Sequence, residues 1–297
     1  MANKPQTIAA FFRQFPDDEA CLQHLFEIRF GQDFSCPRCE RPSKWFRIKA
    51  ERAYSCQWCG HHLHPTVGTP FAKTRTPLQM WFYAIFLFTT TRNGVAAKEL
   101  QRQLGVTYKT AWRMADEIHK HMASVDGDVQ IGGPGKVVEA DETFVGGEAR
   151  GAGSGFKKNK TIVFGMVERG GDVVTQIVSS RHAARLVPHM QRHIVPGSEV
   201  HTDEFGSYDN LVIKGFKHKR VNHRAGEYVR EGVGVNTIEG FWSQLKRTIS
   251  GTHIQVSGKH LWKYAKEAEY RFNRRDRGDQ MLSELLGTFG PLKPQSD

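Results

Sequence analysis

Three acidic residues, far apart along the chain, occupy positions where a carboxylate could hold a metal ion. Asp141 interrupts the run Val-Val-Glu-Ala-Asp-Glu-Thr-Phe-Val at 137–145, which predicts a mostly buried strand over 136–145. A buried carboxylate is costly unless a partner or a metal compensates its charge. Asp203 ends a second predicted strand over 199–203, and Glu239 lies on a predicted helix over 236–247. Hard divalent cations prefer carboxylate oxygens, so these acids are candidate Mg2+ ligands.

The third acid has a second interpretation. Thirty-five residues, 204 to 238, separate Asp203 from Glu239, and Lys246 follows Glu239 by seven residues. Seven residues are two helical turns, so Lys246 shares a face with Glu239 and could hold a phosphate beside the metal. The pair Asn236-x-x-Glu239 also fits a capping box, in which the glutamate only closes the start of the helix.

Four of the five cysteines indicate a different metal. Cys36 and Cys39 form one C-x2-C pair, Cys56 and Cys59 form another, and sixteen residues separate the pairs. This spacing predicts a zinc ribbon, in which two knuckles present four thiolates to one tetrahedral Zn2+. We expect the fifth, Cys21, to be a buried helical thiol. We do not expect His61, His62 and His64 to be ligands, because four thiolates already complete a structural site.

Composition favours a nucleic-acid partner. The 297 residues carry a net charge of +11 and a pI of about 9.5, which is typical of proteins that bind a polyanion. The longest apolar run, 80–88, is too short to cross a bilayer, and Met1–Pro5 is polar, so neither a membrane span nor a signal peptide is expected. Few cysteines, mostly paired at metal-binding spacing, suit the cytoplasm.

The N-terminal half reads as helices around the ribbon, followed by a DNA-binding motif. We predict helices over 7–30 and the ribbon within 1–70. A buried helix follows, with Thr76 as its cap and Pro77 in its first turn. Residues 94–122, within a region 71–123, predict a helix-turn-helix that breaks at Gly105. The second helix of such a motif enters the major groove. Its early residues are the candidate base contacts, although an ordinary helical hairpin is the alternative: Thr107, Tyr108, Lys109 and Arg113.

The C-terminal half predicts one α/β domain. After a glycine-rich linker at 124–135 come strands over 136–145, 161–168 and 172–179, a helix over 182–193, strands over 199–203 and 219–223, and then helices. This is the order of an RNase H-like domain, here 136–275, in which the first and fourth strands are neighbours and bring Asp141 beside Asp203. The expected class is therefore α+β multidomain, with an amphipathic piece and a tail at 276–297.

The end of this domain is strongly basic. Residues 214–275 hold fourteen Lys and Arg against five Glu. Phosphate contact is the functional interpretation and a solvated helix face is the alternative. We expect a closing helix over 260–275 to carry three side chains on or near DNA: Arg271, Arg274 and Arg275.

Together these motifs resemble a known family. Asp141, Asp203 and Glu239, with the 35-residue gap and Lys246, are similar to the D,D(35)E-lysine motif of DDE transposases. More narrowly, the ribbon, the helix-turn-helix and the motifs Glu-Ala-Asp-Glu-Thr, His-Thr-Asp-Glu-Phe and Asn-Thr-Ile-Glu-Gly-Phe-Trp-Ser-Gln-Leu-Lys resemble IS1595 (ISXO2-like) insertion-sequence transposases. The similarity runs from about residue 15 to 275.

The resemblance implies an activity and its partners. Such a transposase binds terminal inverted repeats in double-stranded DNA and catalyses strand cleavage and strand transfer with Mg2+ or Mn2+. It works as a homodimer, and we expect it in the nucleoid. Members of the family use Asn or Glu as the third ligand; Glu239 is favoured here because Lys246 keeps its offset from it, and Asn236 is the alternative. A DNA-binding regulator derived from a transposase and an RNase H-like nuclease are the competing functions.

Overall fold

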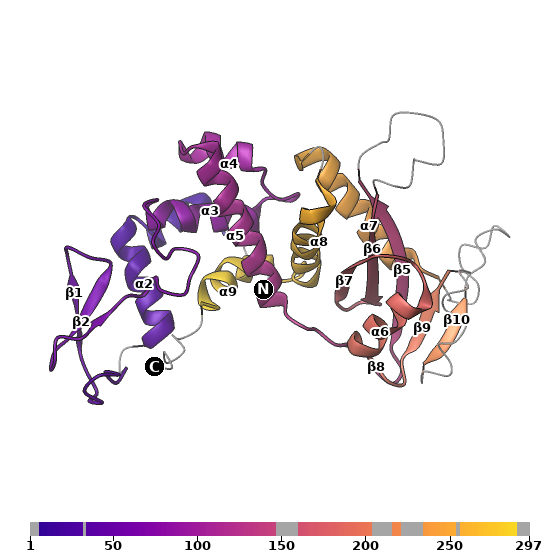
Figure 1. Cartoon of the computed structure of the whole chain (residues 1–297), viewed down its shortest axis with the longest axis horizontal. Helices are drawn as coiled ribbons and strands as arrows, with labels where there is room; N and C mark the ends of the chain where they lie inside the picture. Colours follow the sequence, from indigo (N-terminus) through magenta and orange to yellow (C-terminus); the bar gives the residue numbers. More distant parts are fainter. Residues whose placement is uncertain are drawn as a thin grey trace. The chain divides into compact units, whose positions relative to one another are not determined.

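The computed structural model describes residues 6–31, 34–146, 160–203, 216–220, 234–253 and 256–289. The chain divides into two compact units (Figure 1). The first comprises 1–121 with 277–297, and the second comprises 122–276. Each is described by itself.

Helices α1 (Ile8–Gln14) and α2 (Asp18–Phe30) open the first unit. They pack on α3 (Leu78–Thr90), which is apolar on nearly every side and mostly buried. Asp18 of α2 joins the two elements, because its Oδ1 accepts the backbone N–H of Gln79, 3.0 Å away, in the first turn of α3. The expected cap of α3 by Thr76 is therefore wrong: Pro77 occupies the cap position, and the carboxylate of another helix does the capping.

The zinc-ribbon segment folds as a small antiparallel sheet. Its strands are β1 (Trp45–Ile48), β2 (Ala53–Cys56) and β3 (His62–Leu63), in that order. Trp45 pairs with Cys56 and Ile48 with Ala53, so the chain between the two cysteine pairs forms a hairpin. This hairpin returns the second knuckle to the first.

Two further helices follow α3, and a sharp turn separates them. Helix α4 (Ala97–Leu104) ends at Gly105, whose φ of +64° suits glycine, and α5 spans Tyr108–Asp126. Thr107 caps α5, since its hydroxyl accepts the N–H of Thr110 at 3.3 Å. After the second unit the chain returns with a 3-10 turn, Gly278–Gln280, and α9 (Met281–Gly287), which packs on α3. The amphipathic piece expected after Asp276 is thus part of the first unit.

A five-stranded sheet forms the centre of the second unit, in the order β10-β9-β5-β6-β7. Strands β5, β6 and β7 are antiparallel neighbours, whereas β9 runs parallel to β5 and β10 runs parallel to β9. The predicted fifth strand begins earlier than expected, and residues 221–223 lie outside the described residues. The strand bounds are β5 Val137–Val145, β6 Thr161–Glu168, β7 Val173–Val178, β9 Glu199–Thr202 and β10 Lys217–Arg220. A small parallel pair joins β4 (Ile131–Gly132) to β8 (Ile194–Val195).

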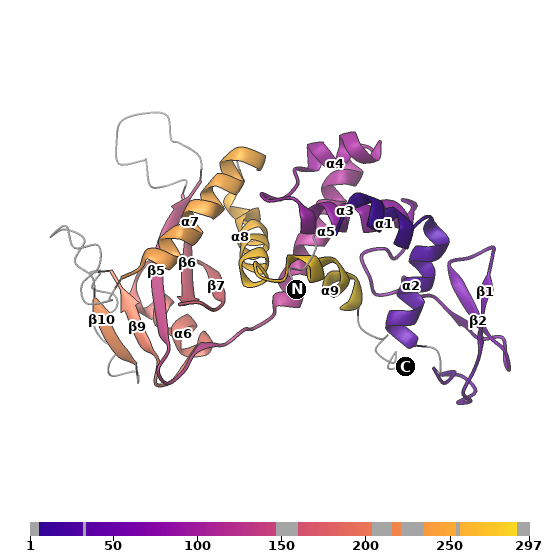
Figure 2. The same ribbon diagram turned by 180° about the vertical axis from the view of Figure 1, so that it is seen from behind.

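Helices cover both faces of this sheet (Figures 1 and 2). Helix α6 (Ala183–His193) packs on the face that carries Val138, Ala140 and Val200. Helices α7 (Asn236–Thr248) and α8 (Gly258–Asn273) pack on the opposite face, and a π-helical turn, Ile249–His253, follows α7. Side chains alternate along a strand, so the α7 face receives the odd-numbered residues of β5 and β9.

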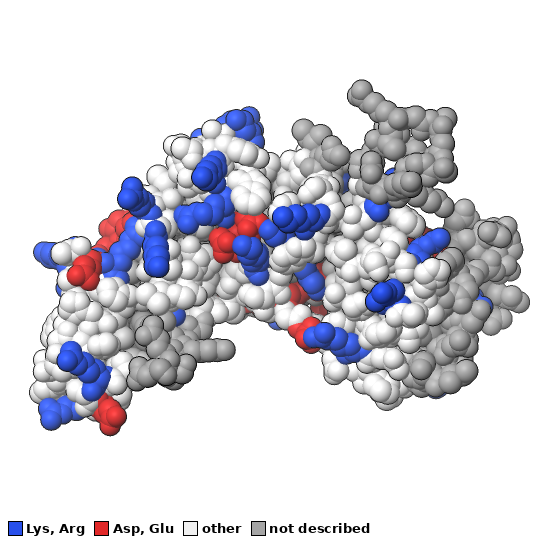
Figure 3. Space-filling view, viewed as in Figure 1, with Lys and Arg blue, Asp and Glu red and all other residues white. Residues whose placement is uncertain are grey.

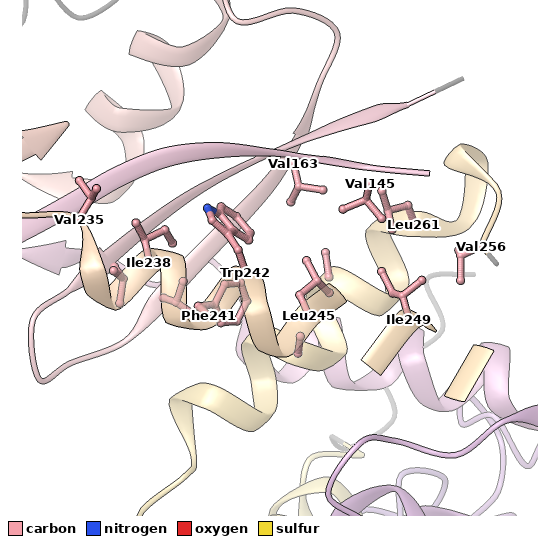
Figure 4. Packing of buried hydrophobic residues seen from close by; sticks show 14 residues of the cluster. Val145, Val163, Val235, Ile238, Phe241, Trp242, Leu245, Ile249, Val256 and Leu261 are labelled. Carbon is pink, nitrogen blue, oxygen red and sulfur yellow. The ribbon is translucent and has the colours of Figure 1, made fainter. Parts of the chain in front are cut away.

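Helix α7 lies very close to the sheet (Figure 4). Its apolar residues, including Ile238, Trp242 and Leu245, are buried against the strands. Gly165 of β6 makes this approach possible: a Cβ there would lie 2.5 Å from Cη2 of Trp242 and 2.9 Å from Cδ1 of Ile238. A side chain at 165 would therefore force Trp242 and Ile238 to move.

In the described part of the chain, no helix is both long enough and apolar enough to span a bilayer. The most apolar, α3, has 13 residues and so a length of about 20 Å, against a hydrocarbon core of about 30 Å.

Candidate functional site

The fold brings the three acids to one end of the sheet. Ala140 of β5 pairs with Thr202 of β9, so the next residues, Asp141 and Asp203, follow side by side on parallel strands. Helix α7 crosses the same face, and the indole N–H of Trp242 donates to Oδ2 of Asp141 at 2.9 Å. Glu239 lies on α7, one turn before Trp242.

Electrostatics supports this grouping. Burial raises the pKa of Asp141, and the negative charges of Asp203 and Glu239 raise it further. Hydrogen bonds from the backbone N–H of Glu142 and from Trp242 oppose the shift, and the resulting pKa is about 6 instead of 3.8. A carboxylate surrounded by other carboxylates is stabilised in its charged form by a cation, so the donor set suits a hard divalent metal.

The acids are not packed as tightly as ligands of one small ion. Among the described residues, the groups whose potential ligand atoms all lie within 4.8 Å of one another are the four cysteines and the set Glu51, His62 and His64. The three acids are in neither group. A pair of divalent ions about 3.5–4 Å apart occupies a larger space than one ion does.

Helix α7 presents the remaining candidates to solvent. Asn236, Glu239 and Lys246 are all exposed. Asn236 is the first helical residue, and the cap residue is Val235, which has no capping side chain. The capping-box alternative for Asn236 and Glu239 is therefore not the arrangement found.

The residue that does cap α7 is Glu139, which the sequence analysis did not single out. It is 1% exposed, and its Oε2 accepts the backbone N–H groups of Thr237 at 2.7 Å and Ile238 at 3.1 Å. Its Oε1 accepts the Thr237 hydroxyl at 3.0 Å and Nε of Arg169 at 2.7 Å. The available signal was position: Glu139 lies two residues before Asp141, hence on the same face of β5.

The four cysteines fit a tetrahedral zinc ion. Sγ of Cys36 lies 3.6 Å from that of Cys59, and Sγ of Cys39 lies 3.9 Å from that of Cys56. Thiolates bound at about 2.3 Å around tetrahedral Zn2+ are separated by about 3.8 Å, so these distances match. Cys21 is buried elsewhere, and burial raises the pKa of its thiol to about 12.

The surroundings act differently on two of the four thiols. A hydrogen bond from the backbone of His61 lowers the pKa of Cys59, but burial and the other three thiols of the cluster outweigh it and raise this pKa to about 11. Burial raises the pKa of Cys56, but hydrogen bonds from the Ser43 hydroxyl and from the backbone N–H groups of Cys59 and Trp58 outweigh it and lower the pKa. The histidines that follow do not join this cluster. His62 instead lies with His64 beside Glu51, its Nδ1 3.9 Å from Oε2 of that glutamate.

The candidate base-contacting residues lie at the start of α5. Thr107, Tyr108, Lys109 and Arg113 are all exposed, and 51% of Tyr108 is accessible. Arg113 donates to Oγ1 of Thr74 at 3.1 Å, so its guanidinium is oriented within the first unit. These side chains are available to a partner.

The three arginines at the end of α8 require a correction. Arg274 is buried and pairs with Asp126 at 2.6 Å, their side chains being 7% and 2% exposed. Arg271 is 9% exposed and pairs at 2.9 Å with Glu267, one turn earlier on the helix. Both guanidinium groups are largely buried and form ion pairs within the fold. Arg275 is the exposed member of the three.

Comparison with known proteins matches both the zinc-ribbon segment and the α/β unit. A family model described as the ISXO2-like transposase domain matches residues 131–273, and one described as the transposase zinc-ribbon domain matches residues 16–62. A zinc ribbon followed by a mixed α/β transposase domain is the class of protein that these matches define.

Two relatives agree with that class. An uncharacterized protein in transposable element ISH50 of Halobacterium salinarum is 27% identical over 302 residues, which cover 93% of this chain and 98% of the relative. An uncharacterized transposase-like protein of Haemophilus influenzae is 34% identical over 120 residues, which cover 38% of this chain and 93% of the relative. The chain belongs to the IS1595 (ISXO2-like) family of insertion-sequence transposases.

Proposed function

We propose that this protein cleaves and joins DNA strands at the ends of an insertion sequence, using Asp141, Asp203 and Glu239 as ligands of Mg2+ or Mn2+. The observation that carries the proposal is the convergence of these acids from β5, β9 and α7, where Asp203 and Glu239 raise the pKa of Asp141. The sheet order, with three antiparallel strands and β9 parallel to β5, supports an RNase H-like catalytic domain over 136–275.

The residues around the acids have separate tasks. When bound, a divalent metal pair supplies an activated oxygen nucleophile and stabilises the leaving oxygen. Trp242 orients Asp141 through its indole N–H. Lys246, exposed on α7 two turns after Glu239, can hold a phosphate next to the acids. Asn236 remains the alternative third ligand, because it is exposed one turn before Glu239.

We assign DNA recognition to the exposed start of α5. In this proposal 71–123 acts as a helix-turn-helix that reads the terminal repeats, 1–70 carries the ribbon, and 124–135 links both to the catalytic domain. Lys and Arg side chains outnumber acidic ones on the described face in Figure 3, which supports phosphate contact beyond the base-reading residues. A homodimer on two transposon ends in the nucleoid completes the proposal.

The test is cleavage and strand transfer on the element's own end fragment in Mg2+. We compare the wild type with Asp141→Asn, Asp203→Asn, Glu239→Gln and Asn236→Ala. Metal stabilisation of the transition state amounts to several kcal/mol, so loss of a ligand should slow cleavage by about 10^3-fold or more, while binding of the end fragment persists.

The outcomes separate the alternatives. Loss of both reactions in Glu239→Gln, with Asn236→Ala active, assigns the third ligand to Glu239; the reverse pattern assigns it to Asn236. Specific binding by a wild-type protein that never cleaves in Mg2+ or Mn2+ would instead identify a DNA-binding regulator derived from a transposase.

A further inference from the structure

We infer that Glu139 is a positioning residue of the acid site: its buried carboxylate fixes the start of α7 against β5 and thereby sets the position of Glu239 relative to Asp141. The inference rests on the proposed function and adds to it a residue that binds neither metal nor DNA. It follows from a set of contacts on the face of the sheet beneath the acids.

Glu139 replaces the missing cap of α7. The first N–H groups of a helix have no partner within the helix, and a side chain of the cap residue usually accepts them. Val235 cannot do so. The Oε2 atom of Glu139, from a strand 98 residues away, accepts the N–H groups of Thr237 and Ile238, the second and third helical residues. Its negative charge also suits the positive end of the helix dipole.

The other side of Glu139 is held by Arg169, which follows β6. Nε of Arg169 donates to Oε1 of Glu139 at 2.7 Å, and a terminal nitrogen donates to the carbonyl of Gly234 at 2.9 Å. One guanidinium therefore binds both the carboxylate and the backbone that leads into α7. Charge-assisted bonds of this kind are short and directional.

His201 extends the same layer to the strand of Asp203. It pairs with Glu139 in the register of β9 and β5, and it is 1% exposed. Its Nδ1 faces two donors, a terminal nitrogen of Arg169 at 3.2 Å and the backbone N–H of Gly234 at 3.4 Å. This nitrogen is therefore the acceptor, and Nε2 donates to Glu199 at 2.7 Å.

The layer lies one step before the acids on both strands, and its contact on α7 lies in the same first turn as Glu239. Glu139 precedes Asp141 by two residues, His201 precedes Asp203 by two, and Thr237 precedes Glu239 by two. Because residues two apart on a strand point to the same face, the pairs on β5 and β9 form two rows, one structural and one acidic. The structural row holds α7 at a fixed depth, and the same helix carries Glu239 and the Trp242 that donates to Asp141.

The main variant is Glu139→Gln, which keeps the shape of the side chain. One amide oxygen can still accept the two α7 N–H groups, but the amide NH2 cannot accept from Arg169 or from the Thr237 hydroxyl. Mn2+ binding to the full-length protein without DNA is measured by electron paramagnetic resonance. The Mg2+ midpoint for cleavage of the end fragment and the affinity for that fragment are measured in parallel.

The matched control is Glu269→Gln. Glu269 is also 1% exposed and also accepts a backbone N–H and a hydroxyl, both from Thr175. It lies on α8 and contacts β7, the edge strand that β6 separates from β5. A non-specific effect of neutralising a buried carboxylate appears in both variants, whereas a displaced α7 start affects only Glu139→Gln.

We expect Glu139→Gln to weaken Mn2+ binding and to raise the Mg2+ midpoint by about 10-fold or more, with DNA affinity unchanged, because residues that orient metal ligands have effects of this size. Glu269→Gln, which neutralises a buried carboxylate on α8, should bind Mn2+ as the wild type does. If Glu139→Gln does not fold, Thr237→Val, which removes only the hydroxyl donor to Glu139, should show a smaller shift in the same direction.

Two results would overturn the inference. One is wild-type Mn2+ binding by Glu139→Gln, and the other is an equal loss of binding by Glu269→Gln. Asp141→Asn distinguishes the inference from the function beneath it. If Asp141→Asn abolishes Mn2+ binding while Glu139→Gln changes nothing, only the inference falls; if Asp141→Asn also binds normally, the acid site is misassigned and both fall.

Discussion

The zinc ribbon and the acid site each bring negatively charged side chains together. They differ in how far apart those side chains lie in the sequence. The four cysteines lie within residues 36–59, and one hairpin brings them within 4.8 Å of one another. The acids span residues 141–239 and depend on two strands and a helix that meet only in the folded sheet. The zinc ribbon therefore forms from residues close together in the sequence. The acid site forms only when distant strands and a helix meet in the fold.

The two sites also differ in what their charges do to the fold. Zinc compensates the thiolates, so the ribbon gains stability from its ligands. Asp141 accepts hydrogen bonds from the indole N–H of Trp242 and the backbone N–H of Glu142, but it lies among other carboxylates. Its raised pKa means that the charged form costs stability until a cation binds. Glu139, two residues earlier, is fully satisfied by four donors.

The largest effect should come from breaking the local site. Cys56→Ser removes one of the four zinc ligands, and structural zinc in small domains contributes on the order of 10 kcal/mol of binding free energy. We expect loss of stoichiometric zinc by elemental analysis and loss of ribbon structure in the first unit. Cys21→Ser, which changes a buried thiol outside the ribbon, should retain its zinc; zinc retained by Cys56→Ser would contradict the assignment.

The second prediction concerns the buried ion pair between Arg274 and Asp126 in the α/β unit. Arg274→Ala leaves Asp126 buried without its partner, which costs about 3–5 kcal/mol of unfolding free energy in comparable pairs. Arg275→Ala, one residue on and exposed, should leave stability within about 0.5 kcal/mol of the wild type. Urea unfolding of both variants measures the difference. Equal unfolding free energies would show that the pair between Arg274 and Asp126 does not stabilise the fold.

The third prediction has the opposite sign. Asp141→Asn should raise the unfolding free energy of the metal-free protein at pH 7 by about 1–3 kcal/mol, because it removes a charge that the fold destabilises while its amide oxygen still accepts from Trp242. The gain is measured by urea unfolding in chelator. A destabilised variant would show that Asp141 is compensated within the protein.

The pH dependence of this gain follows from the raised pKa. Between pH about 4 and 6 the folded wild type binds more protons at Asp141 than the unfolded chain does, so its stability falls as pH rises through that window. The advantage of Asp141→Asn should therefore vanish below pH about 4 and reach its full size above about 6. Mn2+ binding by the wild type should weaken as pH falls through about 6, since metal competes with the proton.

The smallest effect tests the orientation of Asp141. Trp242→Phe keeps an aromatic ring between α7 and the sheet but removes the indole N–H, a net loss of about 1 kcal/mol. We expect Mn2+ affinity to fall by roughly 10-fold, as for other residues that orient metal ligands. Trp262→Phe, at an exposed position of α8, is the control and should bind Mn2+ normally.

Sequence reasoning succeeded where the determinants were local or periodic. Cysteine spacing identified the ribbon, and the apolar run around Asp141 predicted β5 almost to the residue. The adjacency of Asp141 and Asp203 required a fold-level expectation about strand order. Glu139 was missed because the sequence around it holds three acids in four residues, and only the distant start of α7 distinguishes the one that caps this helix.

The prediction of an exposed basic face at the end of α8 failed for a related reason. A count of Lys and Arg over 214–275 does not reveal which side chains point inward. Arg271 could have been found, since Glu267 precedes it by four residues and such pairs contact each other on a helix. Arg274 could not, because its partner Asp126 lies 148 residues earlier and on another helix.

The hydrogen bonds between Glu139 and α7 also have a consequence for the order in which the molecule forms. The ribbon can close once residue 59 has left the ribosome, because all of its ligands precede that point. The acid-bearing sheet cannot mature until the helix that begins at Asn236 is present, since Glu139 has no backbone donors for its Oε2 atom before then. Contacts so distant in sequence form slowly. A nascent or truncated chain would therefore carry a finished ribbon but no completed acid site, which delays metal-dependent chemistry until nearly all of the protein has been synthesised.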